Sequence, residues 1–170
     1  MRSQKEKHMK RIFAMLAGVV MGLAGASLLL AQVMANPFIG TWKLNLEKSK
    51  YTGVEAPKSA TRTIEADNDG EIVTYVGVAA DGTPIRYSFT TNLDGKPASV
   101  SGFGTHGGID TQVVTRIDAY TLKGTATKAG KVIYTQRTVV SKDGKVTTET
   151  REGTNENGKP ISVVAVWEKQ

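Results

Sequence analysis

Residue types that carry redox and metal chemistry are almost missing from this chain of 170 residues. It has no cysteine, its methionines all lie before Ala35, and His106 is the sole histidine after His8. Disulfide bonds, thiolate chemistry and soft-metal sites are thereby excluded, and one histidine without clustered carboxylates does not make a metal site. We therefore predict a domain without cofactor or metal, held together by its core alone.

Long apolar runs are also missing, with one exception near the N-terminus. A basic start between Arg2 and Arg11 is followed by the uncharged residues 12–31 and by Val33-Met34-Ala35. This layout predicts a helical secretory signal peptide over residues 1–35, cleaved after Ala35, and hence an exported protein, periplasmic or extracellular. An uncleaved membrane anchor is the alternative, because the run approaches the roughly 20 residues that span a bilayer.

A strong charge of one sign is missing from the rest of the chain. The full sequence carries 22 Lys and Arg against 16 Asp and Glu, a net charge of +6. Without the five basic residues and one acidic residue before residue 35, 17 and 15 remain, a net charge of +2. A basic excess would indicate a nucleic-acid or anionic membrane partner. We expect no nucleic-acid partner, and membrane contact through the signal segment alone.

Amphipathic helical periodicity is missing after residue 35. Instead, turn-forming pairs such as Asp81-Gly82, Asp143-Gly144 and Asn157-Gly158 recur every 11 to 14 residues. Glycine after Asp or Asn adopts the positive φ angles of tight hairpins. Short strands at this spacing are typical of an all-β sandwich or barrel.

The predicted fold is all-β, an antiparallel up-and-down meander barrel over residues 36–170. The segments amount to about ten strands joined by consecutive hairpins. We favour the barrel over a sandwich because closure removes exposed strand edges. The segment Glu47–Lys58, with Gly53 and Pro57, is expected to be the longest connection and to run across one end of the barrel.

Two stretches resemble known proteins of the calycin group. Phe38–Leu44 (FIGTWKL) is similar to the first strand of lipocalins and fatty-acid-binding proteins, which carries a Gly-x-Trp. Val164–Lys169 (VAVWEK) looks like the last strand of the fatty-acid-binding proteins. With GTWKLN, Arg116–Asp118 (RID) and Val139–Lys145 (VVSKDGK), the chain also resembles exported bacterial lipocalin-like proteins. The resemblance implies a lipocalin-like barrel that holds a small ligand.

Two family features do not carry over. Fatty-acid-binding proteins place two short helices after the first strand, where this chain has Glu47–Lys58, which lacks helical periodicity. They also hold the ligand carboxylate with an Arg-x-Tyr pair on the last strand, and the matching positions here are Ala165 and Trp167. The resemblance therefore implies the fold more than the ligand.

Alternation along the strands predicts which side chains point inward, where they would line a ligand cavity or fill the barrel. Trp42 shares parity with Phe38 and Leu44, and a structural plug at one end is favoured for it over a ligand contact. Among five arginines (Arg62, Arg86, Arg116, Arg137 and Arg151), Arg137 is the preferred interior cation, with an outward position as the alternative. The candidate barrel-lining residues are Trp42, Tyr87, Phe89, Tyr134, Arg137 and Trp167.

Nothing in the sequence forms a catalytic constellation. A nucleophile needs a base within reach, and His106 lies in a glycine-rich stretch (Gly102–Gly108) that we interpret as a flexible hairpin. We therefore predict a non-catalytic, monomeric barrel that binds or carries a small apolar or amphipathic ligand. A filled barrel that acts as a structural or protein-interaction module is the alternative.

Overall fold

The computed structural model describes residues 36–68, 70–155 and 157–170. The predicted signal peptide, residues 1–35, lies outside the described residues, so its helix and its cleavage stay predictions. Residues Pro37–Gln170 cluster as one unit. In the part of the chain that the structure describes, no helix is long and apolar enough to cross a membrane.

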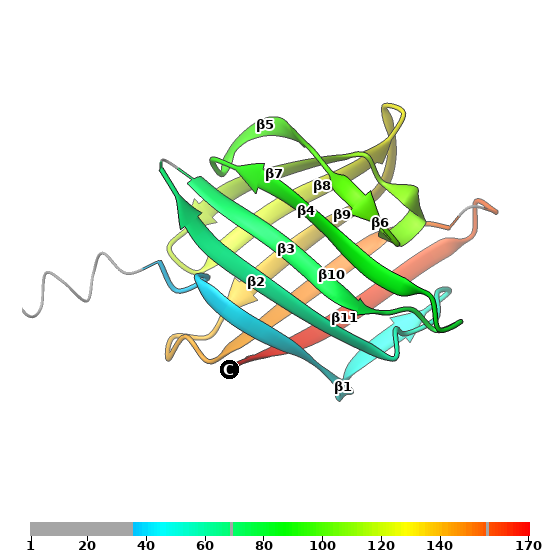
Figure 1. The fold of residues 1–170 in the computed structure, drawn as a ribbon, viewed down its shortest axis with the longest axis horizontal. Helices are drawn as coiled ribbons and strands as arrows, with labels where there is room; N and C mark the ends of the chain where they lie inside the picture. Colours follow the sequence, from blue (N-terminus) through cyan, green and yellow to red (C-terminus); the bar gives the residue numbers. More distant parts are fainter. Residues whose placement is uncertain (1–35, 69, 156) are drawn as a thin grey trace, which may run out of the picture. The chain divides into compact units, whose positions relative to one another are not determined.

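Nearly all of the described chain is β-structure (Figure 1). The elements are, in order, β1 (Gly40–Thr52), β2 (Ser59–Asp67), β3 (Gly70–Val78), β4 (Pro84–Thr91), β5 (Asp94–Ser99), β6 (Ser101–Phe103), the 3₁₀ helix η1 (His106–Gly108), β7 (Thr111–Asp118), β8 (Thr121–Lys128), β9 (Lys131–Val140), β10 (Val146–Thr154) and β11 (Pro160–Lys169).

The strands form a single antiparallel sheet in the order β5-β7-β8-β9-β10-β11-β1-β2-β3-β4-β6. In Figure 1, β2, β3 and β4 lie in front of β8 to β11, which form the far wall of the same barrel. The predicted all-β, up-and-down meander barrel is confirmed, with 11 strands where the sequence suggested about ten.

One segment closes the barrel by changing its partner halfway along. β5 pairs with β7, and after Val100 the chain continues as β6, which pairs with β4. Gly102 in β6 has φ +125°, and a Cβ there would lie 2.2 Å from the carbonyl oxygen of Arg86. Glycine is therefore needed for β6 to approach β4. The barrel is nearly closed, with a seam along β5 and β6.

The predicted alternation holds on the strands that carry large apolar residues. Tyr87 and Phe89 of β4 are buried, and so are Ala165 and Trp167 of β11. Because successive side chains of a strand point to opposite faces, these residues fill the interior while their neighbours face solvent. They belong to one core cluster that also contains Phe38, Trp42, Leu44, Ile64, Val73, Tyr75, Ile85, Val114, Leu122, Val140 and Val163.

Glu47–Lys58 was predicted to be a connection between strands. This is wrong for residues 47–52, because β1 continues to Thr52. Asn45 pairs with Val166 and Lys50 with Val164, so residues 46–49 form a bulge opposite a single residue of β11. Leu46 has the same parity as Trp42 and Leu44, but the bulge places it at the surface, where it is 39% exposed. No helix lies among the described residues between β1 and β2, in agreement with the lack of helical periodicity in Glu47–Lys58.

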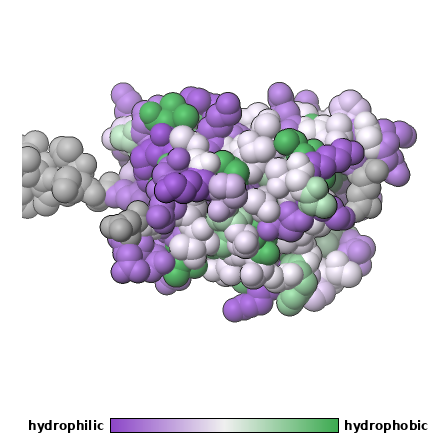
Figure 2. Space-filling view, turned by 90° about the horizontal axis from the view of Figure 1, so that it is seen from above, coloured by the Kyte–Doolittle hydropathy of each residue, from purple (hydrophilic) through white to green (hydrophobic). Residues whose placement is uncertain are grey.

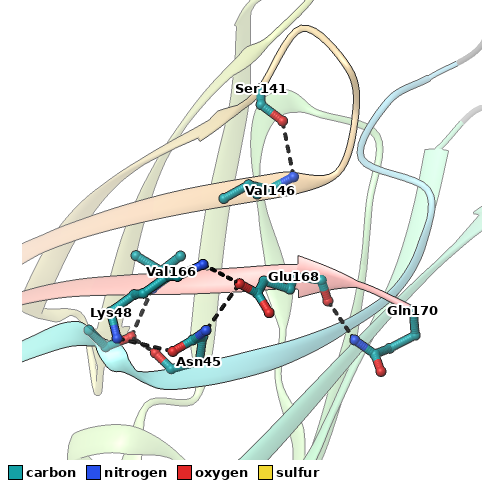
Figure 3. A network of polar contacts seen from close by, with 8 residues as sticks. Asn45, Lys48, Ser141, Val146, Val166, Glu168 and Gln170 are labelled. Atoms are coloured by element: carbon teal, nitrogen blue, oxygen red, sulfur yellow. Dashed lines mark hydrogen bonds and ion pairs between the residues drawn. The ribbon is translucent and has the colours of Figure 1, made fainter.

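Side chains within the bulge satisfy the backbone groups that it frees (Figure 3). The Asn45 side chain accepts a hydrogen bond from the backbone N–H of Lys48 at 3.0 Å. The Ser49 hydroxyl donates to the Asn45 carbonyl at 2.6 Å and accepts from the Val166 N–H at 3.0 Å. Glu168 accepts from Asn45 Nδ2 at 3.0 Å and from Lys48 Nζ at 2.8 Å. These contacts attach the bulge to β11.

The face of the molecule shown in Figure 2 is mainly polar, with apolar residues scattered among hydrophilic ones. Isolated exposed apolar side chains such as Ile117, Phe103 and Val132 are ordinary on a soluble surface.

Candidate functional site

A charged cluster lies inside the barrel, between walls that face each other. Arg62 comes from β2, and Glu149 and Arg151 come from β10. Their exposed fractions are 4%, 0% and 6%. Glu149 Oε2 accepts from Arg62 Nη1 at 2.8 Å, and its Oε1 accepts a short hydrogen bond from Arg151 Nε. One carboxylate thus holds two guanidinium groups.

Neutral neighbours hold Arg62 in this position. Its Nη2 donates to the Thr147 hydroxyl at 2.8 Å, and its Nη1 also contacts the Tyr75 hydroxyl at 3.3 Å. The guanidinium carbon lies 4.7 Å from the centre of the Trp167 ring, a distance at which the ring face attracts a cation. Arg62 is therefore fixed by hydrogen bonds along its edge and an aromatic ring against its face.

The charge of the cluster is not balanced internally. Two guanidinium groups cannot lose their protons in a protein, and Glu149 supplies the single negative charge between them. Burial raises the pKa of Glu149, but the charges of Arg151 and Arg62 outweigh burial, so that its pKa lies below the usual value. The cluster therefore carries a net positive charge in the interior.

A pocket of about 180 Å³ opens beside this cluster at one end of the barrel, and we call it the end pocket. Tyr134, Arg151 and Val163 are buried and form its inner wall. Val54 and Glu55 come from the β1–β2 connection, and other lining residues come from η1 and the strand ends. The full lining is Tyr51, Val54, Glu55, His106, Gly107, Ile133, Tyr134, Arg151, Thr154, Asn155, Ile161 and Val163.

His106 lies on the lining of the end pocket, in the η1 turn. The sequence predicted a flexible hairpin here, and the structure has a 3₁₀ turn in which Gly107 adopts φ +65°. Surrounding side chains desolvate the imidazole and lower its pKa to about 4, and the charge of Arg151 adds to this effect. At neutral pH His106 is therefore uncharged, and it does not compensate or add to the charge of the cluster.

The opposite end of the barrel is filled. Trp42 is fully buried, and its Nε1 donates to the Phe38 carbonyl at 2.8 Å. Lys169 Nζ lies 5.1 Å from the centre of the Trp42 ring, which completes this closure. Nearby, Glu71 pairs with Arg116 at 3.2 Å. Trp42 thus has the placement of a structural plug.

The structure separates the sequence-derived candidates into three groups. Tyr134 lines the end pocket. Trp42, Tyr87, Phe89 and Trp167 are buried in the core and do not line that pocket. Arg137 alone forms the third group, because it is exposed.

Arg137 requires a correction, because it is exposed on the outer face of β9. The register of β9 turns Tyr134, Thr138 and Val140 inward, so that Arg137 points outward. It lines an open outer groove with Ile117 and Lys123 instead of the interior. The interior cations are Arg62 and Arg151, which the sequence offered as candidates without preferring them.

Glu149 was not among the sequence-derived candidates. The inward residues of β10 are Thr147, Glu149 and Arg151. Both faces of this strand are polar, so apolar alternation could not tell them apart. The available signal was the spacing of Glu149 and Arg151, because opposite charges two residues apart lie on the same face of a strand.

Groups of three or more His, Cys, Asp or Glu that could hold a metal ion are not found among the described residues. The buried polar side chains of the described residues carry guanidinium, carboxylate, hydroxyl and amide groups.

Comparison with known proteins gives one result of note. No family model matches the chain, and no curated protein matches it. Among solved structures, the chain is similar to zebrafish ileal bile acid-binding protein complexed with cholic acid. The two share 17% sequence identity over 79% of this chain and 99% of that one, with a TM-score of 0.47.

Proposed function

We propose that this protein binds a small amphipathic molecule with an anionic group in the end pocket. The observation that carries the proposal is the net positive charge of the Arg62, Glu149 and Arg151 cluster beside a mainly apolar pocket. A buried charge without a partner is costly, and an anionic ligand would supply the missing negative charge.

Arg151 is the group that would contact the anion. It lines the end pocket, and its hydrogen bond to Glu149 is made by Nε, one corner of the guanidinium. The guanidinium fork matches a carboxylate, and charge-assisted hydrogen bonds of this kind are among the strongest in proteins. Tyr134, whose ring centre lies 5.1 Å from the guanidinium carbon, helps to hold Arg151 in place.

The apolar part of the ligand would lie against Val54, Ile133, Ile161 and Val163. Burial of apolar surface is the main source of affinity in such pockets, and the few polar groups set orientation. The pocket volume of about 180 Å³ is below the roughly 300–1,000 Å³ of sites for drug-sized molecules. The ligand is therefore small, or part of it extends out of the pocket.

A filled barrel without a ligand is the second candidate, and one observation favours it. The middle and the far end of the barrel are packed with aromatic and charged side chains. The space that remains there measures about 30 Å³, and we call it the inner void; Arg62, Glu71 and Val114 are among the residues that line it. A long ligand could not enter the middle of this interior. The two candidates differ in whether the end pocket takes up an amphiphile.

Chemical-shift mapping with sodium octanoate separates these candidates. Binding in the end pocket shifts the backbone amides of Ile133, Thr154 and Ile161, which line it, in a saturable manner. The amides of Ile117 and Thr150, which line the outer groove, serve as the control and stay in place. Shifts confined to the outer groove, or no shifts at millimolar octanoate, would favour the filled barrel.

The proposed role is binding without catalysis. Glu149 is the buried carboxylate nearest the pocket, and it is held ionised between two guanidinium groups. A general acid or base needs a pKa near the working pH. The pKa of Glu149 is shifted below its usual value, away from neutral pH. Glu149 therefore serves to offset part of the positive charge of Arg62 and Arg151.

We further propose that the protein acts outside the cytoplasm after cleavage between Ala35 and Asn36. The proposal rests on the basic start, the apolar run and Val33-Met34-Ala35. N-terminal sequencing of the exported protein tests it. A first residue of Asn36 is expected, and a full-length chain retained in the membrane fraction would contradict it.

A further inference from the structure

Arg62 also borders a second space inside the barrel, the inner void of about 30 Å³. Arg62 lines the inner void and not the end pocket, and Glu71, which pairs with Arg116, lines the inner void too. A space of about 10–15 Å³ is enough for one water molecule, provided that two to four polar partners surround it. The inner void meets the size condition.

The polar partners are present. Arg62, Glu71, Thr138, Thr91 and Gln136 contribute to a lining that is otherwise apolar. Arg62 Nη1 and Nη2 are satisfied by Glu149, Tyr75 and Thr147. Its Nε is buried and finds no acceptor among the described residues. A buried donor without an acceptor is unfavourable, and more so on a charged group.

We propose that the inner void is a binding site for ordered water, which accepts a hydrogen bond from Arg62 Nε and donates to the Glu71 carboxylate. Water is favoured over a small anion because the Glu71 side chain, which pairs with Arg116, also lines the void, and a carboxylate repels an anion. Thr138 of β9 also lines the void, and its hydroxyl can donate a hydrogen bond to the water or accept one from it.

The hydration site links the Arg62–Glu149 ion pair to the Glu71–Arg116 ion pair. With it, hydrogen bonds run from Arg151 at the end pocket through Glu149, Arg62, the water and Glu71 to Arg116. The site is independent of the proposed ligand, because it lies in the inner void and requires no occupant of the end pocket.

High-resolution crystallography and water–protein NOE measurements on the purified protein test this proposal together. The expected result is a density peak within hydrogen-bond distance of Arg62 Nε and an NOE between water and the Arg62 Nε–H. No density in the void and no NOE would overturn it. An anomalous peak in the void from crystals grown in bromide would also overturn it, because the occupant would then be an anion.

Filling the void gives an independent readout. Val114 lines it from β7 and is buried, so Val114→Ile adds a methyl group that competes with the water. If the water is required, V114I abolishes the NOE and lowers the melting temperature. A higher melting temperature would indicate a dry void and overturn the proposal. The matched control is Val139→Ile on the outer face of β9, which is expected to leave both measurements unchanged.

Discussion

Arg62 and Glu149 form an ion pair of 2.8 Å across the interior of the barrel, although 87 residues separate them in the sequence. Their strands, β2 and β10, are not neighbours in the sheet, so the pair connects facing walls. Such a pair depends on closure of the barrel. Removing one partner of a buried ion pair costs more stability than replacing both partners by apolar side chains.

Glu149→Gln is expected to lower the free energy of unfolding by about 3–5 kcal/mol, because it leaves two buried guanidinium groups without a counter-charge. Urea denaturation at neutral pH measures the change. Glu152→Gln on the same strand is the matched control, since Glu152 is exposed, and it is expected to stay within about 0.5 kcal/mol of wild type. Equal effects of the two substitutions would contradict the proposed importance of the cluster.

The pH dependence of stability follows from His106. Its pKa is about 4 in the folded protein, against about 6.5 in an unfolded chain. Between these values the unfolded state binds more protons, so the free energy of unfolding falls as the pH drops from about 6.5 to about 4.

His106→Gln is expected to reduce the pH dependence of the free energy of unfolding between pH 6.5 and 4, as measured by urea denaturation at several pH values. The lowered pKa of Glu149 acts separately. Its stabilisation is complete above the unfolded carboxyl value of about 4.3 and is lost as the pH falls through the lower folded value. The loss of stability in stronger acid therefore remains in H106Q. An unchanged slope between pH 6.5 and 4 in the variant would disprove the assignment to His106.

Trp42→Ala is expected to lower the free energy of unfolding by about 3–5 kcal/mol, the usual cost of removing a buried tryptophan side chain. The affinity for octanoate should stay the same, because Trp42 does not line the end pocket. Calorimetric unfolding and a binding titration measure the two properties. Leu46→Ala, at the exposed bulge of the same strand, is the control with little effect on either. A large loss of affinity in W42A would assign Trp42 to the ligand site.

The fold could be predicted from the sequence because its signals are local. Turn pairs such as Asp81-Gly82 and Asp143-Gly144 mark the hairpins, and the alternation in β4 and β11 identifies the inward faces. The bulge in β1 could not be predicted, because it depends on contacts of Asn45 and Ser49 with β11, which lies at the other end of the chain.

The candidate site was predicted in part. Tyr134 follows from alternation, but the choice of Arg137 over Arg62 and Arg151 was wrong, because Thr-rich strands have two polar faces. Which face turns inward is decided by pairing with neighbouring strands. Glu149 pairs in space with Arg62 from another strand, and no pattern within a single strand of the sequence reveals that contact.

The most direct test of the proposed function compares the dissociation constants of octanoate and octanol by titration calorimetry, for wild type, Arg151→Gln and Arg137→Gln. A charged hydrogen bond contributes about 1.5–3 kcal/mol, so wild type should bind octanoate at least about tenfold more tightly than octanol. R151Q should bring this ratio close to one, and R137Q, on the outer face, should leave it unchanged. Equal affinities in wild type, or an unchanged ratio in R151Q, would contradict an anion site at Arg151.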